Sequence, residues 1–312
     1  MNYYPVYPAC LNQGEFTVVR FALDMLTGCR LEPGTLLSLR PALRQAAAEV
    51  LGEFALNLFD APLSADQWSL RRHQKPAPGF VLHVTRHALG EMMEGDRLEL
   101  EVLLLGSAAQ SIGALVAIIR QLGTQGLIHG EGCFEIAEIC SLSSAGDWQR
   151  FGSAALQGAG VTPELIRLDH WLEDNWPLRV PVLLEFDTPL RLVTAGRVLR
   201  RPRFEQLFPF LLRRVTSMLH AYCILEAVDD PAPLLQAARS CRAAWHTIDW
   251  LDWRETERQE RVGGLLGSLR IDGPELDAIL WVLLLATLFG VGKGAAYGAG
   301  HCRLQVAEYT GC

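Results

Sequence analysis

The sequence lacks the markers of several common protein classes. Residues 1–10 contain no basic segment followed by an apolar one, so they do not read as a secretory signal. The longest nearly pure apolar run, residues 278–291, is shorter than the ~20 residues that a membrane-spanning helix needs. The eight cysteines include no Cys-x-x-Cys pair, which argues for reduced thiols and against a zinc site. We expect a cytoplasmic globular protein with no membrane partner, no metal and no cofactor.

Charge is unevenly distributed along the chain. The 312 residues carry a formal charge of −7, which argues against indiscriminate binding of nucleic acid. The segment 191–214 is the exception, because it holds seven arginines and one acid, Glu205. The arginines are Arg191, Arg197, Arg200, Arg201, Arg203, Arg213 and Arg214. One local surface is therefore expected to be strongly positive.

Residues 290–300 form a glycine-rich loop, with five glycines among eleven residues. Glycine allows positive φ and leaves backbone N–H groups uncovered, as close approach to a phosphate requires, and Lys293 adds a positive charge. The loop is not a Walker phosphate loop, because Gly294 follows Lys293 and the preceding residues, 276–289, predict a helix instead of a strand. The same context argues against a dinucleotide fingerprint. A simple turn between helix and strand remains the alternative.

The loop spacing occurs twice. Gly126, Gly130 and Gly132 have the same G-x3-G-x-G spacing as Gly294, Gly298 and Gly300. Each copy follows an apolar segment that predicts a helix and precedes a segment that predicts a strand. Two such loops in matching contexts indicate an internal duplication.

The remaining pattern is consistent with two similar halves. The first half predicts strands at 16–23, 80–85, 97–105 and around 136–138, with helices at 40–59 and 112–122. The second predicts strands at 181–187, 243–250, 264–271 and 302–309, with helices at 203–223 and 276–289. Both halves read β-α-β-β-α-β, which predicts an α+β protein of tandem ferredoxin-like domains. We divide the chain into an N-terminal domain (1–145), a linker (146–180) and a C-terminal domain (181–312).

Several segments of the second half together resemble one family. They are the glycine loop, residues 252–259, 263–267, 188–191 and 196–203. In this order they resemble the CRISPR RNA-processing endoribonucleases of the RAMP superfamily. The resemblance implies tandem ferredoxin-like domains facing each other across a cleft. It also implies metal-independent cleavage of CRISPR repeat RNA by attack of a 2′-hydroxyl, and often retention of the guide RNA in an effector complex with other Cas proteins.

The RNA-binding residues that we predict fall in two groups. Arginine side chains are suited to phosphates and guanine edges, and the first group is Arg197, Arg200, Arg201 and Arg203. The second group is in or beside the glycine loop: Gly292, Lys293, Gly294, Tyr297, Gly298, Gly300 and His301. Two alternatives stay open, namely that the arginines only solvate the start of a helix and that Tyr297 covers the core instead of stacking on a base. Arg213 and Arg214 are expected on the polar face of that helix.

The catalytic residue is harder to choose, because the chain has no histidine before His73. Metal-free RNA cleavage needs proton transfer, for which histidine is suited, and positive charge to stabilise the phosphorane. The family commonly places its histidine in the first domain, after or near the first helix. We therefore choose His73, with Lys75 and Arg72 as helpers. His83 is expected to be packed or solvated, and His301 to touch RNA without transferring protons.

Three alternatives remain. Lysines and arginines can replace the histidine in some family members, and other members cap the guide RNA without cutting it. A protein of unrelated function could instead use the glycine loop for a small phosphorylated ligand.

Overall fold

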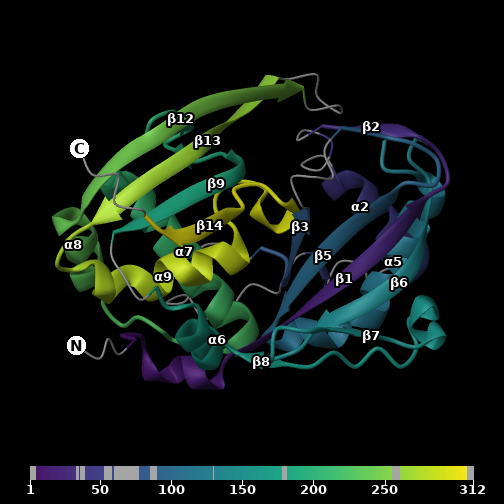
Figure 1. Cartoon of the computed structure of the whole chain (residues 1–312), viewed down its shortest axis with the longest axis horizontal. Helices are drawn as coiled ribbons and strands as arrows, with labels where there is room; N and C mark the ends of the chain where they lie inside the picture. Colours follow the sequence, from purple (N-terminus) through teal and green to yellow (C-terminus); the bar gives the residue numbers. More distant parts are fainter. Residues whose placement is uncertain are drawn as a thin grey trace.

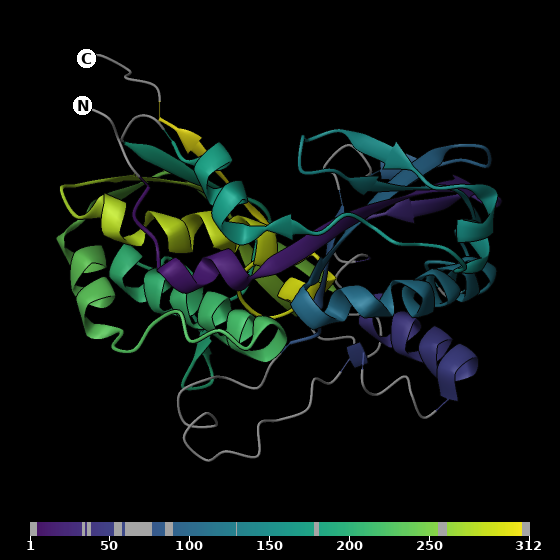
Figure 2. The same cartoon turned by 90° about the horizontal axis from the view of Figure 1, so that it is seen from below.

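The computed structural model describes residues 5–32, 35, 39–52, 58–59, 77–84, 90–128, 130–177, 181–254 and 261–307. The four main strands of the first half are β1 (Glu15–Met25), β3 (Phe80–Val84), β5 (Arg97–Leu105) and β6 (Phe134–Leu142). They form an antiparallel sheet in the order β3-β5-β1-β6, to which β7 (Trp148–Arg150) adds at the edge. Helices α2 (Leu39–Leu51) and α5 (Ile112–Gln125) lie together on one face of this sheet (Figure 2).

The second half repeats this arrangement. Its strands are β9 (Val182–Leu190), β12 (Arg242–Arg254), β13 (Arg261–Asp272) and β14 (Cys302–Val306), in the order β12-β13-β9-β14. Helices α7 (Phe204–Cys223) and α9 (Leu276–Phe289) pack against this sheet. The shorter helix α8 (Ala232–Ser240) follows α7 in the chain and adds to the same core. With the strands of each half counted from one to four, both sheets read 2-3-1-4. The predicted tandem ferredoxin-like fold is therefore confirmed.

Shorter elements connect the main helices and strands or lie at the edges of the two sheets. They are η1 (Ala9–Gln13), β2 (Cys29–Leu31), β4 (Gly90–Met92), η4 (Gly106–Ser111), η5 (Ser153–Gln157), β8 (Ile166–Arg167), α6 (Leu168–Asn175), β10 (Val193–Thr194), β11 (Arg197–Val198) and η6 (Ala295–Tyr297). Within the expected linker, β7 pairs with β6 and β8 pairs with β1, while Leu168 and Leu172 of α6 are buried in the core of the second half. Residues 146–177 are thus folded against both halves.

Helix α9 is buried on all sides, with eleven of its fourteen residues in the core. Such a helix has no polar stripe, which is why its sequence is apolar all round. It ends at Gly290, whose φ of 62° is strained for other residues and whose amide donates to Ala286 O at 3.0 Å. Helix α5 ends in the same way at Gly126, whose φ is 82° and whose amide donates to Leu122 O at 2.8 Å.

The two glycine loops are structurally equivalent, but in a different register from the one that the motif suggests. Leu127 N donates to Gly132 O at 3.2 Å, and Val291 N donates to Gly300 O at 3.0 Å. Gly126 therefore corresponds to Gly290 and not to Gly294. The second loop is four residues longer, because ten positions separate its end glycines where six separate those of the first.

The longer loop carries η6, which reaches the first half beside β3 (Figure 1). Tyr297 is 5% exposed and belongs to the core of the first half, where its ring stands edge-on to Phe80 with centroids 5.8 Å apart. Conversely, Phe16, Val18 and Leu103 of the first sheet belong to the core of the second half. The halves therefore bury apolar surface in each other, as closely docked domains do.

We predict that Tyr297→Ala destabilises the protein by about 3 kcal/mol, because it removes a buried aromatic ring from the contact between the halves. Tyr297→Phe keeps the ring and is expected to retain most of the stability. Urea unfolding at pH 7 measures both variants. Equal stability of the alanine variant and the wild type would contradict the contribution assigned to this ring.

Candidate functional site

The end of β9 runs beside the glycine loop. Asp187 N donates to His301 O at 3.0 Å, Gly300 N donates to Pro189 O at 3.1 Å, and Lys293 N donates to Arg191 O at 2.9 Å. These bonds fix residues 187–191 against residues 293–301. Arg191, the first arginine of the positive segment, is thereby held next to Lys293.

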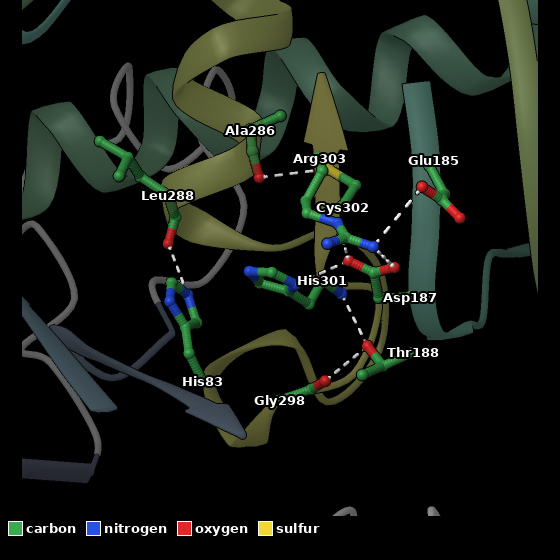
Figure 3. A network of polar contacts seen from close by, with 10 residues as sticks. All are labelled: His83, Glu185, Asp187, Thr188, Ala286, Leu288, Gly298, His301, Cys302 and Arg303. Atoms are coloured by element: carbon green, nitrogen blue, oxygen red, sulfur yellow. Dashed lines mark hydrogen bonds and ion pairs between the residues drawn. The ribbon is translucent and has the colours of Figure 1, made fainter. Parts of the chain in front are cut away.

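A polar network surrounds His301 (Figure 3). His301 N donates to Thr188 Oγ1 at 2.8 Å, and this hydroxyl donates to Gly298 O at 2.6 Å. His301 Nδ1 lies 3.6 Å from Asp187 Oδ2. Arg303 holds the same carboxylate with two contacts, Nε to Oδ2 at 2.7 Å and Nη2 to Oδ1 at 2.8 Å. A bidentate contact of this kind fixes the carboxylate plane as well as its position.

The carboxyl group of Asp187 is ionised in this setting. Burial raises its pKa, but the contact with His301 and the charge of Arg303 lower it more, so the pKa lies below its usual range. The Asp187 side chain is 10% exposed, whereas that of His301 is 24% exposed. The buried carboxylate of Asp187 therefore lies against the imidazole of His301, which is partly exposed to solvent.

His83 of β3 joins the network from the first half. Its Nε2 donates to Leu288 O, at the end of α9, at 3.0 Å. Its ring centroid is 4.5 Å from that of His301. Burial lowers the pKa of His83 to about 3, helped by His301, so its imidazole is neutral at pH 7. Of the two expectations for His83, packed or solvated, the structure shows the packed one, and the packing partner is the other half of the protein.

The predicted arginines are exposed, but only one of them is at the helix start. Arg197 is on β11, directly after the tight turn at Ala195 and Gly196, and Arg200 and Arg201 precede α7. In the described part of the chain none of these three forms an ion pair, and the Arg200 guanidinium lies 5.2 Å from the centroid of Trp250. Arg203 is the N-cap of α7 and pairs with Glu205 at 2.8 Å.

The prediction that Arg214 lies on the polar face of α7 is wrong. Arg214 is 4% exposed, and its Nη2 donates to Phe289 O at 2.9 Å. Burial lowers its pKa to about 10. The side chain points inward because the C-terminal carbonyls of α9 need donors and a cation is favourable at a helix C-terminus. Arg213 is exposed, as expected.

The glycine loop is mostly buried. The amides of Tyr297, Gly298 and Gly300 donate to Gly294 O, Ala295 O and Pro189 O. They are therefore occupied and not available to a phosphate in this conformation. Gly292 and Gly294 are half-buried and Lys293 is exposed. The two alternatives for Tyr297 were stacking on a base and covering the core, and in the structure this side chain lies in the core.

The residues chosen for catalysis, Arg72, His73 and Lys75, lie outside the described residues, so their assignment stays a prediction. Within the described ranges, no group of three or more His, Cys, Asp or Glu side chains is arranged to hold a metal ion. No helix there is long and apolar enough to cross a membrane.

The partners of His301 were not predicted from the sequence. Asp187 and Arg303 are on different strands, and only the register of β9 with β14 brings them together. Their position in the sequence could have identified them. Asp187 directly precedes Thr188, and Arg303 follows the glycine loop closely, and both segments had already been singled out. Arg191 was counted in the positive segment but not chosen, although its Nε is buried with no hydrogen-bond partner in the described structure.

The fold and the site define a class of protein, the tandem ferredoxin-like proteins with a C-terminal glycine loop. Residues 184–302 match the family described as CRISPR-associated endoribonuclease Cas6, and residues 55–159 match a model described as an N-terminal domain. The family that this chain resembles is therefore the CRISPR RNA-processing endoribonucleases of the RAMP type, as the sequence motifs indicated. No curated protein sequence matches the chain.

Solved structures show the same fold over nearly the whole chain. A Cas6 protein (TTHB231) in a product complex has a TM-score of 0.55 and 16% identity, covering 93% of this chain and 99% of that one. Thermus thermophilus Cas6 (TTHB231) has a TM-score of 0.53 and 14% identity, covering 94% and 99%. A partial Cas6-RT-Cas1–Cas2 complex has a TM-score of 0.60 and 15% identity, covering 95% of this chain and 47% of that one.

We predict that His83 makes the folded state lose stability in acid. The unfolded imidazole has a pKa near ~6.5 and the folded one about 3, so between these values the unfolded state binds a proton that the folded state does not. The free energy of unfolding should fall as pH decreases, by at most about 1.4 kcal/mol per pH unit from this group. Urea unfolding of the wild type and His83→Gln between pH 7 and pH 4.5 measures the difference. Identical pH slopes would contradict the assignment.

Proposed function

We propose that this protein binds CRISPR repeat RNA and cleaves it as an endoribonuclease without a metal ion. The observation that carries the proposal is the Cas6 family match over residues 184–302. That range contains the arginine segment, the glycine loop and the network of Asp187 and His301. The structural neighbours include a Cas6 protein in a product complex, which supports the same function. We place the reaction in the cytoplasm.

The RNA surface in this proposal is made by side chains more than by backbone. Arg197, Arg200 and Arg201 are exposed and form no ion pair in the described structure. Exposed guanidinium groups without an ion-pair partner can bind phosphates or guanine edges. Lys293 and Arg191, adjacent to each other at the glycine loop, extend the positive surface to the network around His301.

The reaction proceeds by attack of a ribose 2′-hydroxyl on the neighbouring phosphorus. The O2′–P bond forms while the P–O5′ bond breaks, which gives a 2′,3′-cyclic phosphate and a 5′-hydroxyl. His73 is our sequence-based choice for proton transfer, with Lys75 and Arg72 stabilising the negative charge. Other Cas proteins are proposed as partners, since a neighbour with this fold occurs in a Cas6-RT-Cas1–Cas2 complex.

We predict that purified protein cleaves a matching repeat RNA from a panel of synthetic CRISPR repeats in EDTA. His73→Ala should slow this cleavage at least about tenfold with little change in affinity. Denaturing gels measure the product, and a 2′-deoxy substitution at the cut position should abolish it. Tight binding without any product would instead identify a guide-RNA cap. Binding of ATP-like compounds with no affinity for any repeat would reject both.

We predict that the double variant Arg200→Glu, Arg201→Glu binds repeat RNA at least about tenfold more weakly. Two lost phosphate contacts should also reduce the slope of log K against log salt by about 1.4. Filter binding at four salt concentrations measures both values. Arg213→Glu is the control and should bind like the wild type, because Arg213 is exposed on α7 and is not among the arginines predicted to bind RNA. Wild-type affinity of the double variant would place the RNA elsewhere.

A further inference from the structure

The two halves of this protein share more than their strand order at the point where the glycine loop enters its last strand. In the second half, Asp187 N donates to His301 O and His301 N donates to Thr188 Oγ1. In the first half, Leu26 N donates to Cys133 O at 2.7 Å and Cys133 N donates to Thr27 Oγ1 at 2.8 Å. The two hydrogen-bond patterns are the same.

This equivalence pairs residues of the two halves one by one. Thr188 corresponds to Thr27, and both hydroxyls accept from the residue that follows the last glycine of the loop. His301 then corresponds to Cys133, and Asp187 to Leu26. The first half makes the same turn with a thiol and an apolar side chain, so the fold itself requires neither a histidine nor an aspartate there. Their presence in the second half needs another reason.

The geometry around His301 points to proton transfer. His301 Nδ1 faces Asp187, and Arg303 fixes that carboxylate through two contacts. The distance of 3.6 Å is longer than a hydrogen bond, as such pairs often are before substrate binds. A proton on Nδ1 directed at the carboxylate leaves the lone pair of Nε2 free to accept another. Within the described residues Nε2 has no hydrogen-bond partner (Figure 3).

His83 does not have these properties. Its Nε2 is used by Leu288 O, and its role is to join β3 to the end of α9. His301, by contrast, is partly exposed, and it lies opposite Asp187, four residues or about 13 Å along the chain from Arg191 at ~3.3 Å per residue. An RNA strand held by Arg191 and Lys293 and running along the end of β9 would reach its imidazole.

We propose that His301 is a catalytic residue of the RNA cleavage, and that Asp187 is its positioning residue. This rests on the proposed endoribonuclease function. Nε2 of neutral His301 takes the proton of the 2′-hydroxyl as O2′ bonds to phosphorus. The P–O5′ bond breaks, and O5′ takes a proton from water. His301 then returns its proton to the hydroxide that remains, so no other reactant is consumed.

Single-turnover cleavage of the matching repeat RNA in EDTA tests this role. His301→Ala should cleave about a hundredfold more slowly while its RNA affinity stays within about threefold of the wild type. Added imidazole should restore part of the rate, which a purely structural defect would not allow. His170→Ala, an exposed histidine on α6, is the matched control and should cleave normally.

The first half supplies a second variant that is expected to fold. Asp187→Leu with His301→Cys copies the residues that the same turn already carries at Leu26 and Cys133. It should keep the thermal unfolding temperature and the RNA affinity and lose cleavage. Asp187→Asn alone should slow cleavage about tenfold and change the pH–rate profile, because the carboxylate no longer orients the imidazole.

The outcomes separate this inference from the function on which it rests. If the wild type and His301→Ala cleave equally fast, His301 is not catalytic and the endoribonuclease function stands. If His301→Ala is slow only because its affinity has fallen, or imidazole has no effect, His301 binds RNA and the catalytic role is rejected. If the wild type binds repeat RNA and never cleaves it, both proposals fail together.

Discussion

The C-terminal end of α9 holds the two halves and the glycine loop in one arrangement. The last carbonyls of a helix have no partner within it and carry its negative end. Here Leu288 O accepts from His83 of the first half, and Phe289 O accepts from the buried Arg214 of α7. Gly290 then turns the chain into the loop, which places Tyr297 in the core of the first half. One helix end thereby positions His83, Arg214 and the loop that leads to His301.

Because of this arrangement, the glycines of the loop do not act mainly by exposing their amides to a phosphate. A glycine loop that binds phosphate exposes its amides, but here several amides are consumed by the turn that carries Tyr297. A Cβ at Gly300 would collide with Val291 O, so the glycine is required by close packing within the loop. The loop positions Lys293, Arg191 and His301 relative to one another. Its contribution to RNA binding is therefore proposed to be the placement of side chains.

Periodicity predicted the fold well because the main strands and helices each bury one face or, like α9, all of them. The register between strands could not be predicted from the sequence. The contact of Asp187 with Arg303 was therefore not foreseen, because it depends on how β14 pairs with β9. Arg214 was placed wrongly because a count of polar positions cannot reveal a buried carbonyl that needs a donor. The motif spacing also misaligned the two loops by four residues, because the helix ends, and not the glycine intervals, define their equivalence.

Of the two equivalent turns, only the second lies in the proposed RNA site of this acidic protein. The strand residue two positions after Cys133 is Glu135, which pairs with Asp24, whereas the residue two after His301 is Arg303, which pairs with Glu185. These charges are paired within each half, since Arg97 holds Asp24 and Arg303 holds Asp187 and Glu185. The two turns therefore differ in chemistry, an imidazole beside a carboxylate against a thiol beside an apolar side chain, and not in charge. The positive charge of the proposed RNA surface comes instead from Arg197, Arg200 and Arg201, which form no ion pair among the described residues, so the chain need not be basic overall.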